Sequence, residues 1–222
     1  FTIELRRPQG EPAAVRYGRA GRLFGYGLNE RGLCVAGTAA DASPELMRAA
    51  GPGLRLGLLG PIILSECATV SEALRLIEAF PVRAESGNIS LLDAAGGAAV
   101  VEVAPAALQV RLADCDRRPM CAVNLFSSGR MPTCSEAAYI ANSERRLETF
   151  REAFGEGGPG LRDVMAFMRS HCQQGSICRH MDGTQQERYH QTVMSLICAP
   201  AFGALFLSQG PPCRAPYRRY GF

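Results

Sequence analysis

Three short apolar runs, with only brief turns between them, constrain the fold of this 222-residue chain more than any other feature. The turns are Ala95-Gly96-Gly97 and Pro105-Ala106. Connections this short join antiparallel strands, because a parallel pair needs a crossover of a dozen or more residues. The sequence therefore predicts an antiparallel meander, with strands at Asn88–Asp93, Ala98–Val103 and Leu108–Ala113.

The first forty residues predict further antiparallel strands. Phe1–Arg7 alternates apolar and polar side chains, as a half-buried strand does. The turn at Pro8–Pro12 leads to a second strand at Ala13–Tyr17, which completes a hairpin. Gly25–Gly37 then begins as a glycine-rich turn and continues as a buried strand, and the Asn29 side chain at its turn is suited to bond nearby backbone amides.

The remaining elements follow from periodicity and turn residues. We expect one helical region over Pro61–Phe80 with Thr69 as a cap, and two further helices at Ser135–Phe154 and Leu161–Ser170. Three more strands are expected at Met120–Phe126, Thr192–Ala199 and Ala204–Ser208. Strands and helices in separate groups favour an α+β class, with residues 1–222 forming a single domain.

Composition excludes several classes of function. The net charge is only +3, with acidic and basic residues interspersed, so we expect no nucleic-acid partner. The basic cluster Arg214, Arg218 and Arg219 is expected to be a solvated tail. No apolar run is long enough to cross a membrane and no signal-like segment is present, so we expect no membrane partner. Nine scattered cysteines favour a reducing, cytoplasmic setting.

Several motifs together resemble one family. Ser86–Gly96, followed by Val101–Pro105, resembles the acyl-coenzyme A:6-aminopenicillanic-acid acyltransferase family of N-terminal-nucleophile hydrolases, relatives of the choloylglycine hydrolases. Further pieces follow in the family's order at Gly27–Leu33, Val123–Phe126, Asn142–Arg146, Ser176–His180 and the tail Gly210–Cys213 with Tyr217 and Tyr220. The resemblance covers nearly the whole chain.

The resemblance implies a four-layer αββα sandwich of two antiparallel sheets covered by helices. It also implies hydrolysis or transfer of an acyl group from a linear amide, with a small-molecule amide as substrate and an acyl-coenzyme A as one candidate donor. In such enzymes autocatalytic cleavage exposes an N-terminal Cys, whose own α-amine, with a pKa of about 8, serves as the base. Many relatives are multimeric, so a homo-oligomer with Arg214–Phe222 as an interface tail is a further expectation.

The expected nucleophile is missing from the sequence. Phe1 is not a nucleophile, and no internal Cys has a free α-amine. We therefore expect the Cys, with the Arg and Asp that follow it in the family, to lie upstream of Phe1, and the chain alone to be inactive. The alternative is a non-catalytic binding or scaffold protein that keeps the same fold.

The resemblance assigns roles to individual residues. Asn124 matches the Asn that stabilises the oxyanion, although a structural Asn at a strand end is the alternative. Arg179 and Arg188 compete for the position of an active-site Arg, and the alternative for either is a surface Arg. Thr38 and Ala39 are expected to line the substrate pocket and to offer a backbone N–H.

Other polar residues have weaker assignments. Asn29 either holds its turn or contacts substrate, and the first role is favoured. Asp93 and Glu102 are expected to be structural residues at sheet ends. The spacing of His171, Cys172, Cys178 and His180 fits no standard zinc pattern, so we expect no metal and no other cofactor; a thiol-rich metal protein is the remaining alternative.

Overall fold

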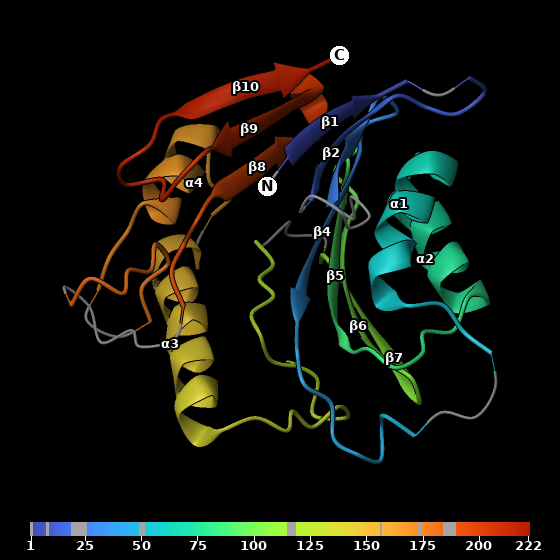
Figure 1. Ribbon diagram of the computed structural model, residues 1–222, viewed down its shortest axis with the longest axis horizontal. Coiled ribbons are helices and arrows are strands. Elements are labelled where there is room, and N and C mark those ends of the chain that lie inside the picture. The colour runs from blue at the N-terminus through green and yellow to red at the C-terminus, as the bar shows by residue number, and fades with distance from the viewer. Residues whose placement is uncertain are drawn as a thin grey trace.

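Two antiparallel sheets lie face to face between two layers of helices (Figure 1). The computed structural model describes residues 2–7, 9–18, 26–48, 52–114, 119–155, 157–172, 175–183 and 190–222. The large sheet contains β1 (Thr2–Arg6), β2 (Ala14–Gly18), β3 (Tyr26–Asn29), β4 (Leu33–Ala39), β5 (Gly87–Asp93), β6 (Ala98–Ala104) and β7 (Ala107–Leu112). The small sheet contains β8 (Ser195–Ala199), β9 (Ala204–Ser208) and β10 (Tyr217–Gly221).

The helices form the two outer layers. They are α1 (Leu56–Glu66), α2 (Val70–Ala79), α3 (Ala137–Phe154) and α4 (Leu161–Met168), and a 3-10 turn spans Pro200–Phe202. In Figure 1, α1 and α2 cover the large sheet, and α3 and α4 lie on the side of the small sheet. This arrangement confirms the predicted α+β class and the αββα order of layers.

The outer face of the large sheet carries the main core. Side chains at alternate positions of β4, β5 and β6, such as Val35, Ile89 and Val101, pack against α1 and α2. Leu59, Ile63 and the other apolar residues on the facing sides of the two helices fill the same core. Burial of this apolar stripe is what holds the helical layer on the sheet.

The helical region predicted over Pro61–Phe80 is confirmed, and it contains two helices, of which the first begins earlier, at Leu56. Pro61 lies inside α1, whose last residue is Glu66. Thr69 begins α2 as predicted: its side chain accepts a hydrogen bond from the Glu72 N–H, and the Glu72 carboxylate accepts one from the Thr69 N–H. This reciprocal capping box separates the two helices.

The inner face of the large sheet is polar where β4, β5 and β6 meet. Thr38, Asn88 and Glu102 stand side by side on these three strands, and we call them the polar row. The irregular segment 119–134 lies over this row, and its backbone groups bond to the side chains of the row. The strand predicted at Met120–Phe126 is therefore wrong, because side chains rather than a neighbouring strand pair with its backbone.

The glycine-rich turn before β4 joins the sheet to α1. Gly32 has φ +84°, which favours glycine, and a Cβ there would meet the Ala94 side chain at 2.7 Å. The buried Asn29 side chain accepts from the Leu33 N–H at 2.9 Å and donates to the carbonyls of Leu64 and Cys67 at 3.0 and 2.8 Å. It thereby pairs carbonyls at the C-terminal end of α1 that the helix cannot pair itself.

The small sheet packs on the β1–β3 side of the large sheet, through Val15, Leu205 and Leu207. The expectation that Arg214, Arg218 and Arg219 belong to a solvated tail is wrong in part, since Tyr217–Gly221 forms β10 beside β9, although Arg218 and Arg219 are exposed. Of the helices that the structure describes, not one is both apolar enough and long enough to span a bilayer.

Candidate active site

Three residues predicted for the site meet at the C-terminal end of β4. The Asn124 side-chain amide donates to the carbonyl oxygen of Ala39 at 3.0 Å. The neighbouring Thr38 hydroxyl donates to the carbonyl oxygen of Val123, also at 3.0 Å. The end of β4 and the segment 119–134, 85 positions apart at these bonds, are thus held together, with Asn124 at the junction.

Asn88 on β5 also holds this junction together through its side-chain amide. Its side-chain nitrogen lies 2.8 Å from the Val123 carbonyl oxygen, 3.0 Å from that of Leu125 and 3.1 Å from the Thr38 hydroxyl. Asn88 is buried, with 1% of its surface exposed. A buried amide that binds the two carbonyls flanking Asn124 fixes the backbone at that position.

The Asn124 amide is also oriented from the other side. A guanidinium nitrogen of Arg146 on α3 donates to the Asn124 side-chain oxygen at 3.0 Å and to the Ser143 hydroxyl at 2.8 Å. Asn142 accepts from Nε of the same guanidinium at 3.2 Å. With its oxygen bonded to Arg146 and one N–H to Ala39, the Asn124 amide has a second N–H for which the described residues offer no partner.

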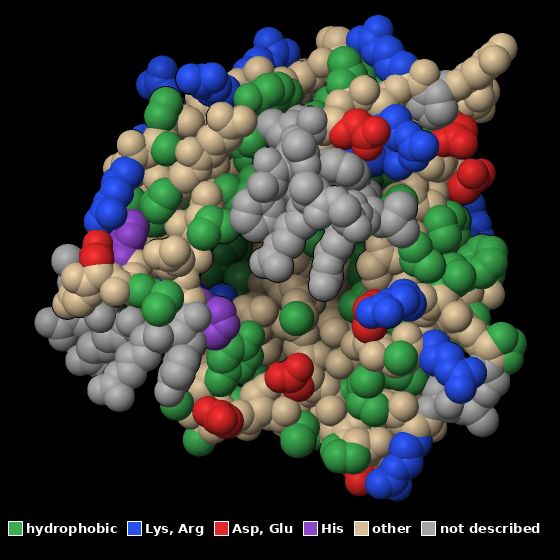
Figure 2. All heavy atoms as spheres, viewed as in Figure 1, with side chains coloured by type: hydrophobic (Ala, Val, Ile, Leu, Met, Phe, Trp, Pro, Cys, Tyr) green, Lys and Arg blue, Asp and Glu red, His purple; other side chains and the backbone are tan. Residues whose placement is uncertain are grey.

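Figure 2 shows that this face of the molecule is hollowed between α3 and the large sheet, with apolar side chains in the visible wall. Segment 119–134 runs through the same region in Figure 1. A separate groove of about 290 Å³ lies between the end of α2 and the β6–β7 turn. That groove is on the outer face of the large sheet, whereas Asn124 is on the inner face.

The structure separates Asn29 from this junction. Asn29 lies at the end of β3, roughly 20 Å along the neighbouring β4 from Ala39 at about 3.3 Å per residue. A substrate contact by Asn29 would break the three hydrogen bonds that hold it, so we leave it out of the proposed site. Its favoured role in holding the turn agrees with these contacts.

Of the two candidate arginines, only Arg179 lies within the residues that the structure describes. The backbone N–H and C=O of the half-buried Arg179 bond to the side chain and the N–H of Thr192, both at 2.9 Å. These bonds fix the backbone of Arg179 between Cys178 and His180. Arg188 lies outside the described residues. The catalytic role of either arginine stays a prediction.

Asp93 and Glu102 have the structural contacts expected of them. Asp93 accepts from the Val70 N–H at the start of α2 and from the Gly97 N–H in the β5–β6 turn. Glu102, fully buried, accepts from the Ser127 and Ser128 N–H groups and from the Ser128 hydroxyl. Both carboxylates are occupied in binding backbone amides.

Three of the described cysteines, Cys34, Cys67 and Cys121, have thiols with raised pKa values. Burial raises the pKa of the Cys121 thiol, although Arg146 acts in the opposite direction. A hydrogen bond with Cys198, together with burial, raises the pKa of Cys34 well above its usual value, and burial raises that of Cys67 to about 11. Because the thiolate is the reactive form, these thiols are weak nucleophiles at neutral pH.

Arg146 and Asn88 are the site residues to which the sequence analysis assigned no role. Both were present in the motifs that carried the family resemblance, Asn142–Arg146 and Ser86–Gly96. That signal could have identified them. Their contacts with Asn124 and its neighbours, however, depend on chain segments that meet only in the fold.

Comparison with known proteins agrees with this architecture. Residues 7–212 match the acyl-coenzyme A:6-aminopenicillanic acid acyl-transferase family. No curated protein matches the chain. Penicillin V acylase from Agrobacterium tumefaciens has a similar structure, with 15% sequence identity and a TM-score of 0.56 over 89% of this chain and 66% of that chain.

Two structures of conjugated bile acid hydrolase variants from Clostridium perfringens are also similar, with 11% identity and TM-scores of 0.52 and 0.50. They cover 95% of this chain, which spans 82% of theirs. At such identities the likeness shows a shared fold, that of the N-terminal-nucleophile hydrolases. Together with the family match over residues 7–212, it shows that the chain belongs to the acyl-coenzyme A:6-aminopenicillanic acid acyl-transferase family.

Proposed function

We propose that this chain forms the oxyanion-stabilising and substrate-binding part of an enzyme that hydrolyses a linear amide or transfers its acyl group. The observation that carries the proposal is the orientation of the Asn124 amide between Ala39 and Arg146. Family membership supports the reaction class, and penicillin V and a conjugated bile acid, named for the structural neighbours, are the first substrates to assay.

The proposed nucleophile is an N-terminal cysteine outside this 222-residue sequence. An internal cysteine cannot supply its own α-amine as base, and the thiols of Cys34, Cys67 and Cys121 have raised pKa values. In the proposed reaction the α-amine takes the thiol proton and the sulfur attacks the amide carbonyl carbon. The amine leaves with that proton, and water or an acyl acceptor then releases the acyl group.

Asn124 would act while the carbonyl oxygen carries negative charge. Its second N–H points a fixed dipole at that oxygen, because the other polar atoms of the amide are already bonded to Ala39 and Arg146. A preorganised donor of this kind lowers the barrier by roughly 3 kcal/mol. Thr38 and Ala39 are proposed to line the same pocket, and Arg179 and Arg188 remain candidates for binding the acyl group or the thiolate.

The proposal is tested on the protein expressed from its complete gene. N-terminal sequencing and intact mass should identify a processed chain that begins with Cys. With that enzyme, Asn124→Ala should lower kcat by about 100- to 1000-fold and leave KM nearly unchanged, because the donor acts mainly in the transition state.

Glu78→Ala is the control, because the exposed Glu78 lies on α2, which covers the outer face of the large sheet, away from Asn124. It should keep a kcat near that of the wild type. Normal self-processing with unchanged turnover of Asn124→Ala would show that the oxyanion assignment is wrong. A chain that is never processed and turns over no amide would instead favour a binding protein on the same fold.

A further inference from the structure

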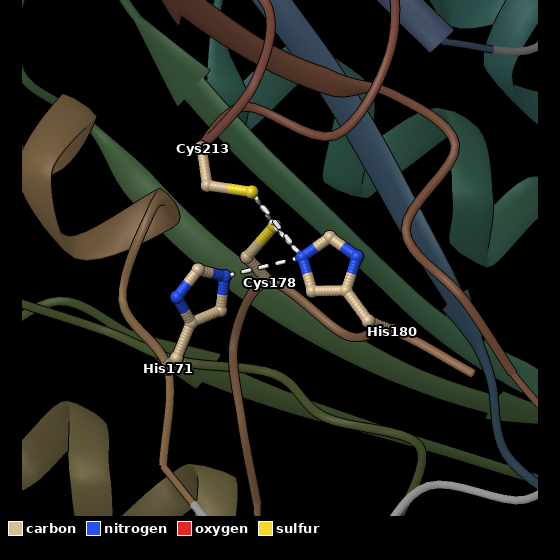
Figure 3. A group of neighbouring side chains, drawn as sticks. All are labelled: His171, Cys178, His180 and Cys213. Atoms are coloured by element: carbon tan, nitrogen blue, oxygen red, sulfur yellow. Dashed lines mark hydrogen bonds between the residues drawn. The ribbon is translucent and has the colours of Figure 1, made fainter. Parts of the chain in front are cut away.

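Four metal-ligating side chains converge beside α4, outside the hydrogen-bond network of Asn124. They are His171, Cys178, His180 and Cys213, which we call the His/Cys cluster, and their ligand atoms all lie within 4.8 Å of one another. Figure 3 shows the four side chains pointing toward a common centre from three segments of the chain. His171 follows α4, Cys178 and His180 come from the segment 175–183, and Cys213 comes from the β9–β10 connection.

Four of the six separations between the ligand atoms are close to those of a tetrahedral metal site. His180 Nε2 lies 3.2 Å from His171 Nε2, 3.2 Å from Cys213 Sγ and 3.6 Å from Cys178 Sγ, and the two sulfurs are 3.5 Å apart. Zinc bond lengths in tetrahedral geometry place two nitrogens about 3.4 Å apart, a sulfur and a nitrogen about 3.6 Å apart, and two sulfurs about 3.8 Å apart.

Hydrogen bonding alone accounts poorly for this arrangement. A ring nitrogen carries either one proton or one lone pair, yet three polar atoms surround His180 Nε2. Only one of them can make a well-directed hydrogen bond to it. A cation at the centre would lie within reach of all four ligand atoms at once.

Hydrogen bonds around the cluster hold the segments that carry the ligands next to one another. The Cys178 N–H donates to the Ser170 carbonyl at 3.0 Å, which brings Cys178 beside His171. Arg169 Nε donates to the Pro212 carbonyl at 3.1 Å, which ties the end of α4 to the residue before Cys213. Such preorganisation is what a closed metal site requires.

We propose that the His/Cys cluster is a structural zinc site with two thiolate and two imidazole ligands. Two sulfurs and two nitrogens in tetrahedral array suit zinc, and four protein ligands leave no open position for catalysis. The two thiols release their protons to solvent on binding, so two thiolates balance the charge of Zn²⁺. The metal joins α4 to the small sheet and fixes the backbone on both sides of Arg179.

This proposal replaces the expectation, drawn from spacing, that no metal binds. The sequence grouping included Cys172, which lies six positions before Cys178. In the fold the fourth ligand is instead Cys213, more than thirty residues further along the chain. Cys172 is therefore the natural control for the site.

The test uses reduced protein from the complete gene, purified without chelator. Elemental analysis should find about one zinc per chain, and cobalt exchanged for zinc should give the visible bands of tetrahedral cobalt with thiolate-to-metal charge transfer. Cys213→Ser and His180→Gln should lose most of the bound zinc, whereas Cys172→Ser should keep it. Circular dichroism establishes that each variant is folded.

A footprint on the wild-type protein keeps the test independent of variant folding. Zinc should protect Cys178 and Cys213 from alkylation, and a chelator should expose both. Wild-type protein that binds neither zinc nor cobalt would overturn the proposal, as would equal zinc loss in Cys172→Ser and Cys213→Ser. A Cys178–Cys213 disulfide in place of bound metal, found by peptide mapping, would also overturn it.

Discussion

The polar row under segment 119–134 and the His/Cys cluster beside α4 both bring polar side chains together, but the two groups differ in what these side chains face. In the polar row, the Glu102 carboxylate and the Asn88 amide nitrogen face backbone groups of the opposite kind at hydrogen-bond distance. In the His/Cys cluster, ligand atoms of the same kind face one another. The first arrangement is bonded largely within the protein, although the Asn88 side-chain oxygen has no hydrogen-bond partner among the described residues. The second is the arrangement for which we propose a bound cation.

This difference distinguishes polar groups that stabilise the fold from polar groups that bind a ligand. Donors matched to acceptors predict a cost in stability when one partner is removed. Ligand atoms that converge on one point predict that stability depends on an ion bound at that point. The two regions should therefore respond differently to mutation and to metal.

The largest effect on stability is expected from Glu102→Ala. Its removal leaves the Ser127 and Ser128 N–H groups without their acceptor and Arg111 without its ion pair at 3.6 Å. We expect the free energy of unfolding in urea to fall by about 3 kcal/mol.

The exposed Glu78→Ala is the control for Glu102→Ala and should change stability by less than about 0.5 kcal/mol. The loss in Glu102→Ala should be the same with zinc and with chelator, because its partners are all protein groups. A loss that depends on zinc would contradict the contrast between the two regions.

A somewhat smaller effect is expected from zinc itself. At a hundredfold excess of free zinc over its Kd, the wild-type protein should gain about 2.7 kcal/mol in unfolding free energy, because the unfolded chain lacks the assembled site. Thermal or urea unfolding with and without chelator measures the gain. Cys213→Ser should show almost none, and an equal gain in that variant would place the binding elsewhere.

The smallest effect is expected at the capping box of α2, which supplies a local reference. Thr69→Ala should lower the unfolding free energy by about 1 kcal/mol, and the exposed Ser71→Ala on the same helix should leave it nearly unchanged. Neither change should alter the response to zinc.

The same capping box should also give a pH dependence. The bond from the Ala68 N–H, with that from Thr69, lowers the pKa of Glu72 below its ordinary value. A lowered folded-state pKa means that this contribution is present at neutral pH and is lost as the pH falls through the folded pKa. Glu72→Gln should flatten that part of the acid-unfolding curve.

Local patterns were sufficient to predict most of the fold. The meander from β5 to β7, the cap at Thr69 and the long helix α3 follow from alternation, helical period and turn residues, all of which act over a few positions. Local patterns gave the wrong prediction for segment 119–134. Its apolar run resembles a strand, but its backbone groups are bonded by the side chains of Thr38, Asn88 and Glu102. The bonded residues lie 85, 35 and 25 positions apart in sequence.

In the candidate sites, too, some residues were assigned from the sequence and others became evident only from the fold. Asn124, Thr38 and Ala39 were assigned from the family resemblance, and the structure brings them together, while their roles in catalysis and binding stay predictions. Arg146 as the partner of Asn124, and Cys213 as the partner of Cys178, could not be predicted, since only tertiary packing brings their segments together.

The strand order of the large sheet has a consequence for how the protein is made. Its strands follow chain order from β1 to β7, so each pairing closes a short loop, except where α1 and α2 intervene between β4 and β5. Short loops cost little entropy and give a low contact order. During synthesis this sheet is therefore expected to assemble hairpin by hairpin as it leaves the ribosome, with Asn88 and Glu102 in position before residues 119–134 emerge to cover them.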